Sequence, residues 1–439
     1  MDLPSFVTPQ LVVSVITMAI IVHVILLTVA YLIYLERKIS AYIQDRIGPN
    51  RVGFDFGLPF LKGLRGMLGL GQPLADGLKF FLKEDYTPTR VDKILFTLAP
   101  AIIIVPALIG FVVIPWGGQW DGTIFGKRLF EGVVHVTGAN VGIGVVYLLA
   151  VASLGVYGVA LGGWASNNKY SFLGGLRATA QMISYEIPLG LSLLAVLLVL
   201  GTLRPEQIVR HQVEHGWLVL SQPLAALIFF IAILAEANRA PFDNAECEQE
   251  LVGGYHTEYS SMRFALFFLA EYAHMVTSSA FLVLLFFGGY HLPLVSGLSP
   301  DAVGFGAVLL KIVVYFTKVV LVICFMMVIR WTIPRLRYDQ IMMMAWQQVI
   351  PVALVLVVGV SVLVYLGQTG LLPVLLLNLG VAVATVLVQP LIPRSMSNQR
   401  VAMYGSRFNP MPGERVRTSP SEAMALADDP IGGTSATHA

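Results

Sequence analysis

The chain has 439 residues, of which 56% are hydrophobic and only 12% are charged, and its mean hydropathy is +0.76. A typical soluble domain carries about 25% charged residues, so the composition excludes a soluble fold and predicts an all-α polytopic membrane protein. The net charge of +2 excludes a nucleic-acid binder that relies on bulk charge. The two cysteines, Cys247 and Cys324, form no Cys-x-x-Cys pair, which argues against an iron–sulfur cluster or a structural zinc site.

Nine apolar stretches are long enough to cross a bilayer, which takes roughly 20 residues. In chain order they cover about residues 11–35, 94–115, 139–162, 182–201, 217–235, 263–288, 303–329, 346–366 and 371–391. We therefore expect one membrane domain over residues 1–393. The segment 394–439 is rich in Pro, Gly, Ser and charge, which predicts a disordered cytoplasmic tail.

The Lys and Arg residues predict which side of the membrane each loop faces, because cytoplasmic loops carry an excess of them. Of the 28 Lys and Arg residues, 22 lie in the tail and in four alternate loops, and four lie in the loops between these. The four basic loops are 36–93, 163–181, 236–263 and 330–345. This distribution predicts a multi-pass protein of the cell's inner (plasma) membrane, with the N-terminus outside and the C-terminus in the cytoplasm. An odd number of spans requires the same outcome.

The first basic loop predicts more than a linker. Residues 72–83 interleave Leu74, Leu78 and Phe81 with Lys79 and Lys83, which predicts an amphipathic helix lying along the membrane interface. One interpretation of the cationic segment 34–53 is that it does no more than anchor the topology. Its Gly-Pro-Asn turn and interleaved apolar residues instead suggest a folded surface that receives a partner.

Two acids fall inside predicted spans, where a charge costs roughly 2.5–3.5 kcal/mol on insertion scales. Glu186 lies near the cytoplasmic start of its span, and Glu271 lies deeper in another. Such acids are by default functional or paired, and Lys311 and Lys318 could supply structural ion pairs. Glu271 and His274 share a helix face, but there is no second Glu-x-x-His sequence for a di-iron site, so no metal site is expected. His274 is then either a satisfied core histidine or part of a proton relay.

The segment 235–260 concentrates acids beside the predicted membrane surface. Its six carboxylates face a single internal arginine, Arg239, and close carboxylates raise one another's pKa and share protons. A solvated acidic loop is the commonest explanation of a charge run, but Phe242, Leu251 and Tyr255 predict a folded segment. The candidate proton-coupling acids are Glu186, Glu236, Asp243, Glu246, Glu248, Glu250, Glu258 and Glu271.

Six segments stand out as motifs. They read YLERKISAYIQDRIGPNRVG (34–53), QPLADGLKFFLKED (72–85), SYEIPLGLSLL (184–194), AEANRAPFD (235–243), EYSSMRFALFFLAEYAHM (258–275) and RWTIPRLRYDQIMMMAWQQVIP (330–351). In this order they resemble the membrane subunit of respiratory complex I that is known as NADH dehydrogenase subunit 1, or as the H subunit in bacteria, over about residues 10–366. The family usually reads PFDLPEGESELVAGF where this chain has PFDNAECEQELVGGY, so the acids match but the residues between them differ. The ninth span and the long tail exceed the usual eight spans.

The resemblance implies a subunit that joins the hydrophilic redox arm of the complex to its proton-pumping arm, with antiporter-like subunits as further partners. It implies a quinone chamber formed or supported by Arg37, Arg46, Arg239, Phe242 and Phe268, and acids that couple quinone reduction to proton translocation. Quinone would be the substrate. Flavin, iron–sulfur clusters and NAD would be bound by partners, so this chain would hold no complete site for NADH oxidation.

Two other functions stay open. One is the equivalent anchor subunit of a membrane-bound hydrogenase or related dehydrogenase, although the full QDRIGPNRVG segment favours complex I. The other is a secondary transporter, which internal repeats with matching Gly- or Pro-interrupted spans would support. We find no such repeat in the sequence.

Overall fold

The computed structural model describes residues 8–54, 66–124, 127–245, 247–293 and 298–388. The predicted tail and Glu246 lie outside these residues. The chain divides into two units, 1–385 and 386–439, and the arrangement below is that of the first.

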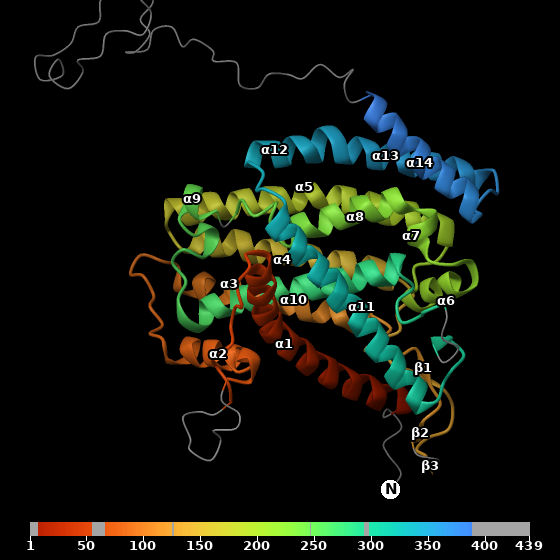
Figure 1. Cartoon of the computed structure of the whole chain (residues 1–439), viewed down its shortest axis with the longest axis horizontal. Coiled ribbons are helices and arrows are strands. Elements are labelled where there is room, and N and C mark those ends of the chain that lie inside the picture. The colour runs from red at the N-terminus through yellow and green to blue at the C-terminus, as the bar shows by residue number, and fades with distance from the viewer. Residues whose placement is uncertain (1–7, 55–65, 125–126, 246, 294–297, 389–439) are drawn as a thin grey trace, which may run out of the picture. The chain divides into compact units, whose positions relative to one another are not determined.

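Long helices confirm the all-α polytopic fold (Figure 1). Within the described ranges, eight helices are long and apolar enough to cross a membrane. They are α1 (Pro9–Ile43), α3 (Lys93–Ile109) with the short helix η3 (Gly110–Val113), α4 (Gly144–Ala165), α5 (Lys169–Leu200), α10 (Ser261–Phe286), α11 (Phe305–Thr332), the continuous run of α12 (Tyr338–Met343), η6 (Met344–Val349) and α13 (Ile350–Tyr365), and α14 (Leu371–Val388).

The fifth predicted span, 217–235, is helical but divided. It forms α7 (Leu218–Ser221) and α8 (Pro223–Glu236), and the 14 residues of α8 fall short of the roughly 20 that cross a bilayer. The break fits Pro223, because proline has no N–H to continue the preceding turn. Asn378 of α14 accepts a hydrogen bond from the Ala225 N–H at 3.4 Å and so satisfies one unpaired donor at the start of α8.

Helix α5 begins at Lys169, well before residue 182, where the fourth span was expected to start. Asn168 sets this start by accepting a hydrogen bond from the Tyr170 N–H at 2.9 Å. Two glycines let the first turns pack closely on α4: a Cβ on Gly163 would lie 3.1 Å from the Gly175 Cα. The predicted loop 163–181 is therefore mostly helical. Glu186 therefore lies near the middle of α5. The span expected from hydropathy left out the polar first turns of this helix, so Glu186 was expected near its start.

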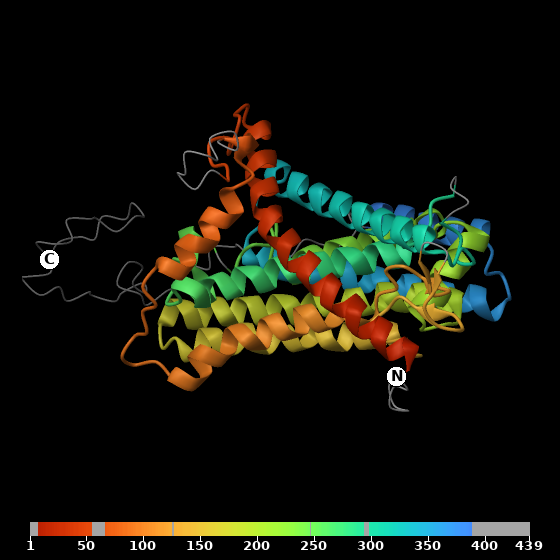
Figure 2. The same ribbon diagram turned by 90° about the horizontal axis from the view of Figure 1, so that it is seen from below.

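The connections gather at two opposite ends of the bundle (Figures 1 and 2). One end holds four short helices: η2 (Met67–Gly69), α2 (Gln72–Leu82), α9 (Glu248–Leu251) and η4 (Gly254–His256). Of these, α2 confirms the predicted amphipathic helix. The other end holds α6 (Pro205–His215) and two antiparallel strand pairs, β1 (Gln119–Trp120) with β4 (Val134–His135) and β2 (Thr123–Ile124) with β3 (Lys127–Arg128). The four loops predicted to be cytoplasmic meet at the first end, where Asn167 donates to the Arg90 carbonyl at 3.0 Å.

Helix α10 is the most deeply buried of the long helices. It packs against α1, α3, α8 and α11, and α1 crosses it obliquely in Figure 2. Glu271, Tyr272, Ser278 and Ser279 of α10 therefore lie inside the protein.

Candidate functional site

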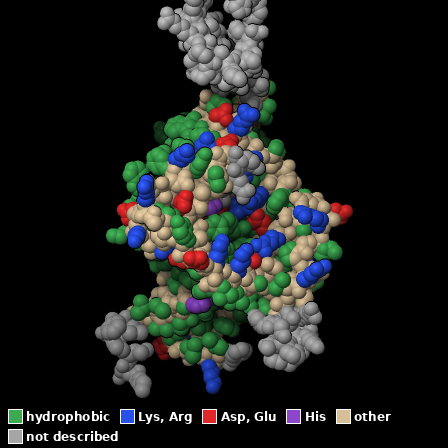
Figure 3. All heavy atoms as spheres, turned by 90° about the vertical axis from the view of Figure 1, so that its left-hand side faces the viewer, with side chains coloured by type: hydrophobic (Ala, Val, Ile, Leu, Met, Phe, Trp, Pro, Cys, Tyr) green, Lys and Arg blue, Asp and Glu red, His purple; other side chains and the backbone are tan. Residues whose placement is uncertain are grey.

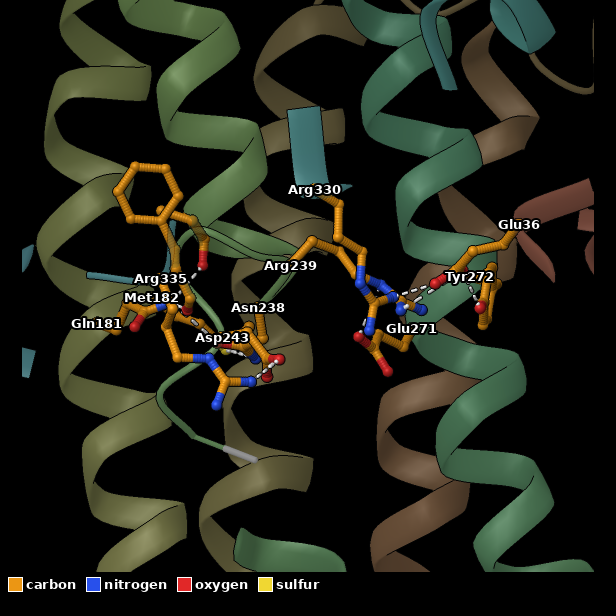
Figure 4. Close-up of polar contacts among 12 residues, drawn as sticks. Glu36, Gln181, Met182, Asn238, Arg239, Asp243, Glu271, Tyr272, Arg330 and Arg335 are labelled. Carbon is orange, nitrogen blue, oxygen red and sulfur yellow. Dashed lines mark hydrogen bonds and ion pairs between the residues drawn. The ribbon is translucent and has the colours of Figure 1, made fainter. Parts of the chain in front are cut away.

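Arg239 is the centre of a buried group of charges. It follows α8 in a loop, and only 6% of its surface is exposed. Its Nε lies 2.9 Å from Glu271 Oε1, and its Nη1 lies 3.9 Å from Glu36 Oε2. The guanidinium carbon lies 4.2 Å from the centre of the Tyr272 ring. Two residues singled out in the sequence, Arg239 and Glu271, are thus direct partners (Figure 4).

Glu36 and Arg330 complete this group, which we call the ion-pair cluster: Glu36 of α1, Arg239, Glu271 and Tyr272 of α10, and Arg330 of α11. Glu36 pairs with Arg330 and accepts a hydrogen bond from the Tyr272 hydroxyl. Glu36, Tyr272 and Arg330 were not among the site residues predicted from the sequence. The spacing of the apolar residues of α1 could have identified Glu36, because Glu36 continues the helical spacing of the buried face. Among the buried residues of α1, those at this spacing are Val13, Thr17, Ile21, Ile25, Val29, Leu32 and Glu36.

A second polar group holds the loop that follows Arg239. The Gln181 side chain donates to the carbonyls of Ala235 and Phe242 at 2.9 and 2.7 Å. Asp243 is buried and accepts a hydrogen bond from Arg335 at 2.7 Å. Figure 4 shows this group beside the ion-pair cluster. The loop is therefore folded, as its apolar residues predicted.

The described acids of segment 235–260 take separate partners instead of clustering with one another. Glu236 Oε1 lies 3.5 Å from His274 Nε2, Glu250 pairs with Arg177, and Glu258 accepts a hydrogen bond from Asn168. Their closeness in the sequence predicted carboxylates that share protons, but the folded loop turns these side chains toward different partners. Glu246 and the side chain of Glu248 lie outside the described part of the chain.

The membrane lysines do not pair with the membrane acids. Lys311 donates to the Ala302 carbonyl at 2.6 Å. Lys318 donates to three backbone carbonyls at 2.7–2.9 Å, those of Phe287, Gly289 and His291. Glu271 pairs with Arg239, and Glu186 accepts a hydrogen bond from Ser153 of α4. The alternative that these lysines neutralise the two acids is therefore wrong. Backbone carbonyls at the end of α10 also attract a cation.

A small cavity lies beside the ion-pair cluster. It has a volume of about 40 Å³ and is lined by residues of α3, α4, α5 and α10 and by the end of α8. Its polar lining includes Glu236, Asn238, Glu271 and His274. This space brings Glu236 and Glu271 together, although the two are far apart in sequence.

The candidate quinone residues divide into two groups. Arg239 belongs to the ion-pair cluster. Phe242 is buried in the same loop, with its ring centre 5.4 Å from that of Tyr185. Arg37 and Arg46 are exposed at the end of α1, where Arg37 pairs with Asp76 of α2 at 2.8 Å.

Phe268 is half-buried on α10, and its ring lies 5.8 Å from that of His256 in η4. Burial lowers the pKa of His256 from its ordinary value to about 4, against the opposing charge of Asp243. The imidazole beside Phe268 is therefore neutral at pH 7.

The end of the bundle that holds these loops is a mixed surface. Figure 3 shows basic and acidic side chains gathered on this face, with hydrophobic side chains between them. The sides of the long helices instead expose large apolar residues such as Leu27, Leu321 and Val358. An apolar side and a charged end fit a protein that meets lipid along its helices and water at this end.

Comparison with known proteins gives one consistent family. The family model described as NADH dehydrogenase matches residues 16–361. The chain is 47% identical over 339 residues to an H subunit of NADH-quinone oxidoreductase from Cytophaga hutchinsonii, covering 76% of this chain and 92% of that protein. It is 44% identical over 342 residues to the H subunit of Flavobacterium psychrophilum (77% and 94%) and 43% identical over 361 residues to an H subunit of Geobacter sulfurreducens (81% and 96%). On this match, and with the motifs and helices described above, the chain belongs to the NADH dehydrogenase family.

Proposed function

We propose that this chain is the membrane subunit of a proton-pumping NADH:quinone oxidoreductase. Its relatives are named as H subunits of NADH-quinone oxidoreductase, and its helices are apolar enough to span a membrane. The observation that carries the proposal further is the buried ion-pair cluster, which meets a folded acidic loop at the charged end of the bundle.

The quinone chamber would lie between this cluster and the charged end. A quinone needs apolar walls for its tail and a few polar groups for its two oxygens. Arg239 supplies a buried cation, and Phe242 and Phe268 supply aromatic surface nearby. Arg37 and Arg46 are exposed and would support the entrance rather than contact the head group.

The coupling acids would respond to charge at the quinone. At 4 Å and an effective dielectric of 20, one unit charge acts on another with about 4 kcal/mol, enough to displace a proton. Glu271 and Glu236 would receive this effect through the cavity that both line. Glu186, hydrogen-bonded to Ser153, would extend the acidic path toward α4, and Asp243, Glu250 and Glu258, with Glu246 and Glu248, would supply protons from the charged end.

The remaining parts of the reaction would belong to partners. Electrons would reach the quinone from a hydrophilic arm that carries flavin and iron–sulfur clusters and docks on the mixed charged face of Figure 3. Antiporter-like subunits would lie beside the helices in the cell membrane. The N-terminus would then face outward and the C-terminus would lie in the cytoplasm.

Purification in mild detergent tests this function directly. The expected result is a complex that contains flavin and iron–sulfur subunits and reduces quinone with NADH. A complex that contains a nickel hydrogenase subunit would favour the hydrogenase alternative. A protein that purifies alone from intact membranes would favour a transporter and overturn the proposal.

A further inference from the structure

The charges of the ion-pair cluster compensate one another. Glu36 and Glu271 supply two carboxylates, and Arg239 and Arg330 supply two guanidinium groups. Arginine stays protonated in proteins. A proton added to either carboxylate would remove one negative charge from beside two buried guanidinium groups, which is costly. The cluster therefore holds a proton less readily than an acid that has no cationic partner.

The Glu236–His274 pair beside the cluster is different. The Oε1 and Nε2 atoms of the two side chains lie 3.5 Å apart, and both side chains are largely buried. Among the described residues, no arginine or lysine lines the cavity beside this pair. One proton makes the pair neutral, whether as imidazolium with carboxylate or as imidazole with carboxylic acid.

Few other titratable groups face this pair. Helix α10 contributes Glu271, one turn before His274, and η4 contributes the phenol of Tyr255. The loop after α8 contributes the neutral Asn238. The cavity walls from α3, α4 and α5 are apolar and consist of Ile103, Pro106, Ala107, Ala152, Gly155, Val159 and Met182. Within the described chain, Glu271 is thus the one other carboxylate that lines this cavity.

The cavity gives the proton a route. Its volume of about 40 Å³ has room for about two or three water molecules, since one needs roughly 10–15 Å³. Glu236, Asn238, Glu271 and His274 offer the two to four polar partners that a buried water requires. Water in this space would connect the pair to Glu271, and through Glu271 to Arg239.

We propose that Glu236 and His274 hold one shared, exchangeable proton and that His274 is a proton-carrying residue of the coupling path. This inference rests on the proposed function. A change of charge near Arg239 and Glu271 breaks the N–H bond of the imidazolium. The electron pair stays on the nitrogen, and the proton passes to water in the cavity. The reverse transfer restores the pair, so the step needs no oxidant or reductant.

The test uses the intact complex in inverted membrane vesicles. The variants are His274→Asn, Glu236→Gln and the double variant, with His211→Asn on α6 at the opposite end of the bundle as the matched control. Assembly is checked on a native gel, and quinone-linked turnover and dye-quench pumping are then measured from about pH 6 to pH 9, on either side of an ordinary histidine pKa. We expect the pumping-linked turnover of each single variant to be about tenfold or more below that of the unmodified complex, because an acid–base group is lost. The double variant should be no slower than the slower single variant, because both changes remove the same proton.

A spectroscopic measurement separates proton transfer from a structural role. Infrared difference spectra of reduced minus oxidised complex, with isotope-labelled histidine, should show an imidazole change. This change should disappear in His274→Asn and persist in His211→Asn. If His274→Asn does not assemble, His274→Gln takes its place, and the unmodified complex still reports whether any histidine changes protonation.

Three results would overturn the inference: a wild-type pH profile in His274→Asn, single effects that multiply in the double variant, or spectra without a histidine change. The outcome also separates this inference from the proposed function. Undiminished pumping in Glu236→Gln and Glu271→Gln together would reject the coupling role of the acids. Lost pumping in both, with normal pumping in His274→Asn, would reject the shared proton alone.

Discussion

Glu271→Gln changes the charge of the ion-pair cluster while keeping its shape. Glutamine retains the volume and a hydrogen-bonding group, but it removes the negative charge beside Arg239 Nε, 2.9 Å away. Both side chains are about 8% exposed, so water screens the pair weakly. Removing one partner of a buried ion pair costs about 3–5 kcal/mol.

The second carboxylate limits this loss. Glu36 lies 3.9 Å from Arg239 Nη1 and would still face it, and a pair at that distance interacts by about 4 kcal/mol at an effective dielectric of 20. Glu36 also serves Arg330 and Tyr272, however, so it cannot compensate both arginines. We therefore expect the complex to assemble with a cluster that carries one extra positive charge. Quinone-linked turnover should fall by about tenfold to a hundredfold, which corresponds to about 1.4–2.7 kcal/mol.

The assay compares two rates in inverted vesicles after assembly is checked on a native gel. Electron transfer from NADH to an artificial acceptor should be unchanged, while quinone-linked turnover and dye-quench pumping fall. Glu214→Gln is the matched control, because Glu214 is exposed on α6 at the opposite end of the bundle. Wild-type pumping per electron in Glu271→Gln would refute the reasoning, since it would show that a hydrogen bond alone suffices there.

The other predictions concern sidedness, the quinone chamber, the path acids and the acidic loop. A reporter fused after Arg90 should be active only if it is a cytoplasmic reporter. Alkaline phosphatase activity there would show that loop 36–93 lies outside and would contradict the predicted topology. Arg239→Ala should lower quinone reduction but not reduction of an artificial acceptor; an unchanged apparent affinity and rate for quinone would exclude Arg239 from the chamber. Glu186→Gln should impair pumping more than Ser153→Ala does, because the carboxyl group and not its hydrogen bond would carry protons; equal, mild effects would assign Glu186 a structural role. Burial lowers the pKa of His256 to about 4. On acidification, the folded loop therefore takes up a proton on His256 at a lower pH than the unfolded loop does. Stability is then full above the ordinary pKa of 6.5 and falls by about 2 kcal/mol at pH 5. Hydrogen exchange of residues 248–260, corrected for its intrinsic pH dependence, should therefore speed up between pH 6.5 and 5 in wild type and not in His256→Gln.

Hydropathy predicts where this chain is helical but not where the helices end. A helix occurs at each of the nine predicted positions, because a backbone inside lipid must satisfy its own hydrogen bonds. The start of α5 was missed because Asn168 and the glycine contacts with α4 extend the helix through polar turns. The shortness of α8 was missed because the mean hydropathy of an apolar stretch does not show the break at Pro223.

The partners of the charged residues were harder to predict than the charged residues themselves. A charge in an apolar stretch stands out, so Arg239 and Glu271 could be named from sequence alone. Their partner Glu36 lies more than 200 residues earlier in the chain, and nothing local to Arg239 points to it. Only the packing of α1 and α11 against α10 brings Glu36, Arg330 and Tyr272 to one place. The packing of α8 against α10 places His274 against Glu236. A residue that the sequence left between a core role and a relay role therefore acquires an acidic partner.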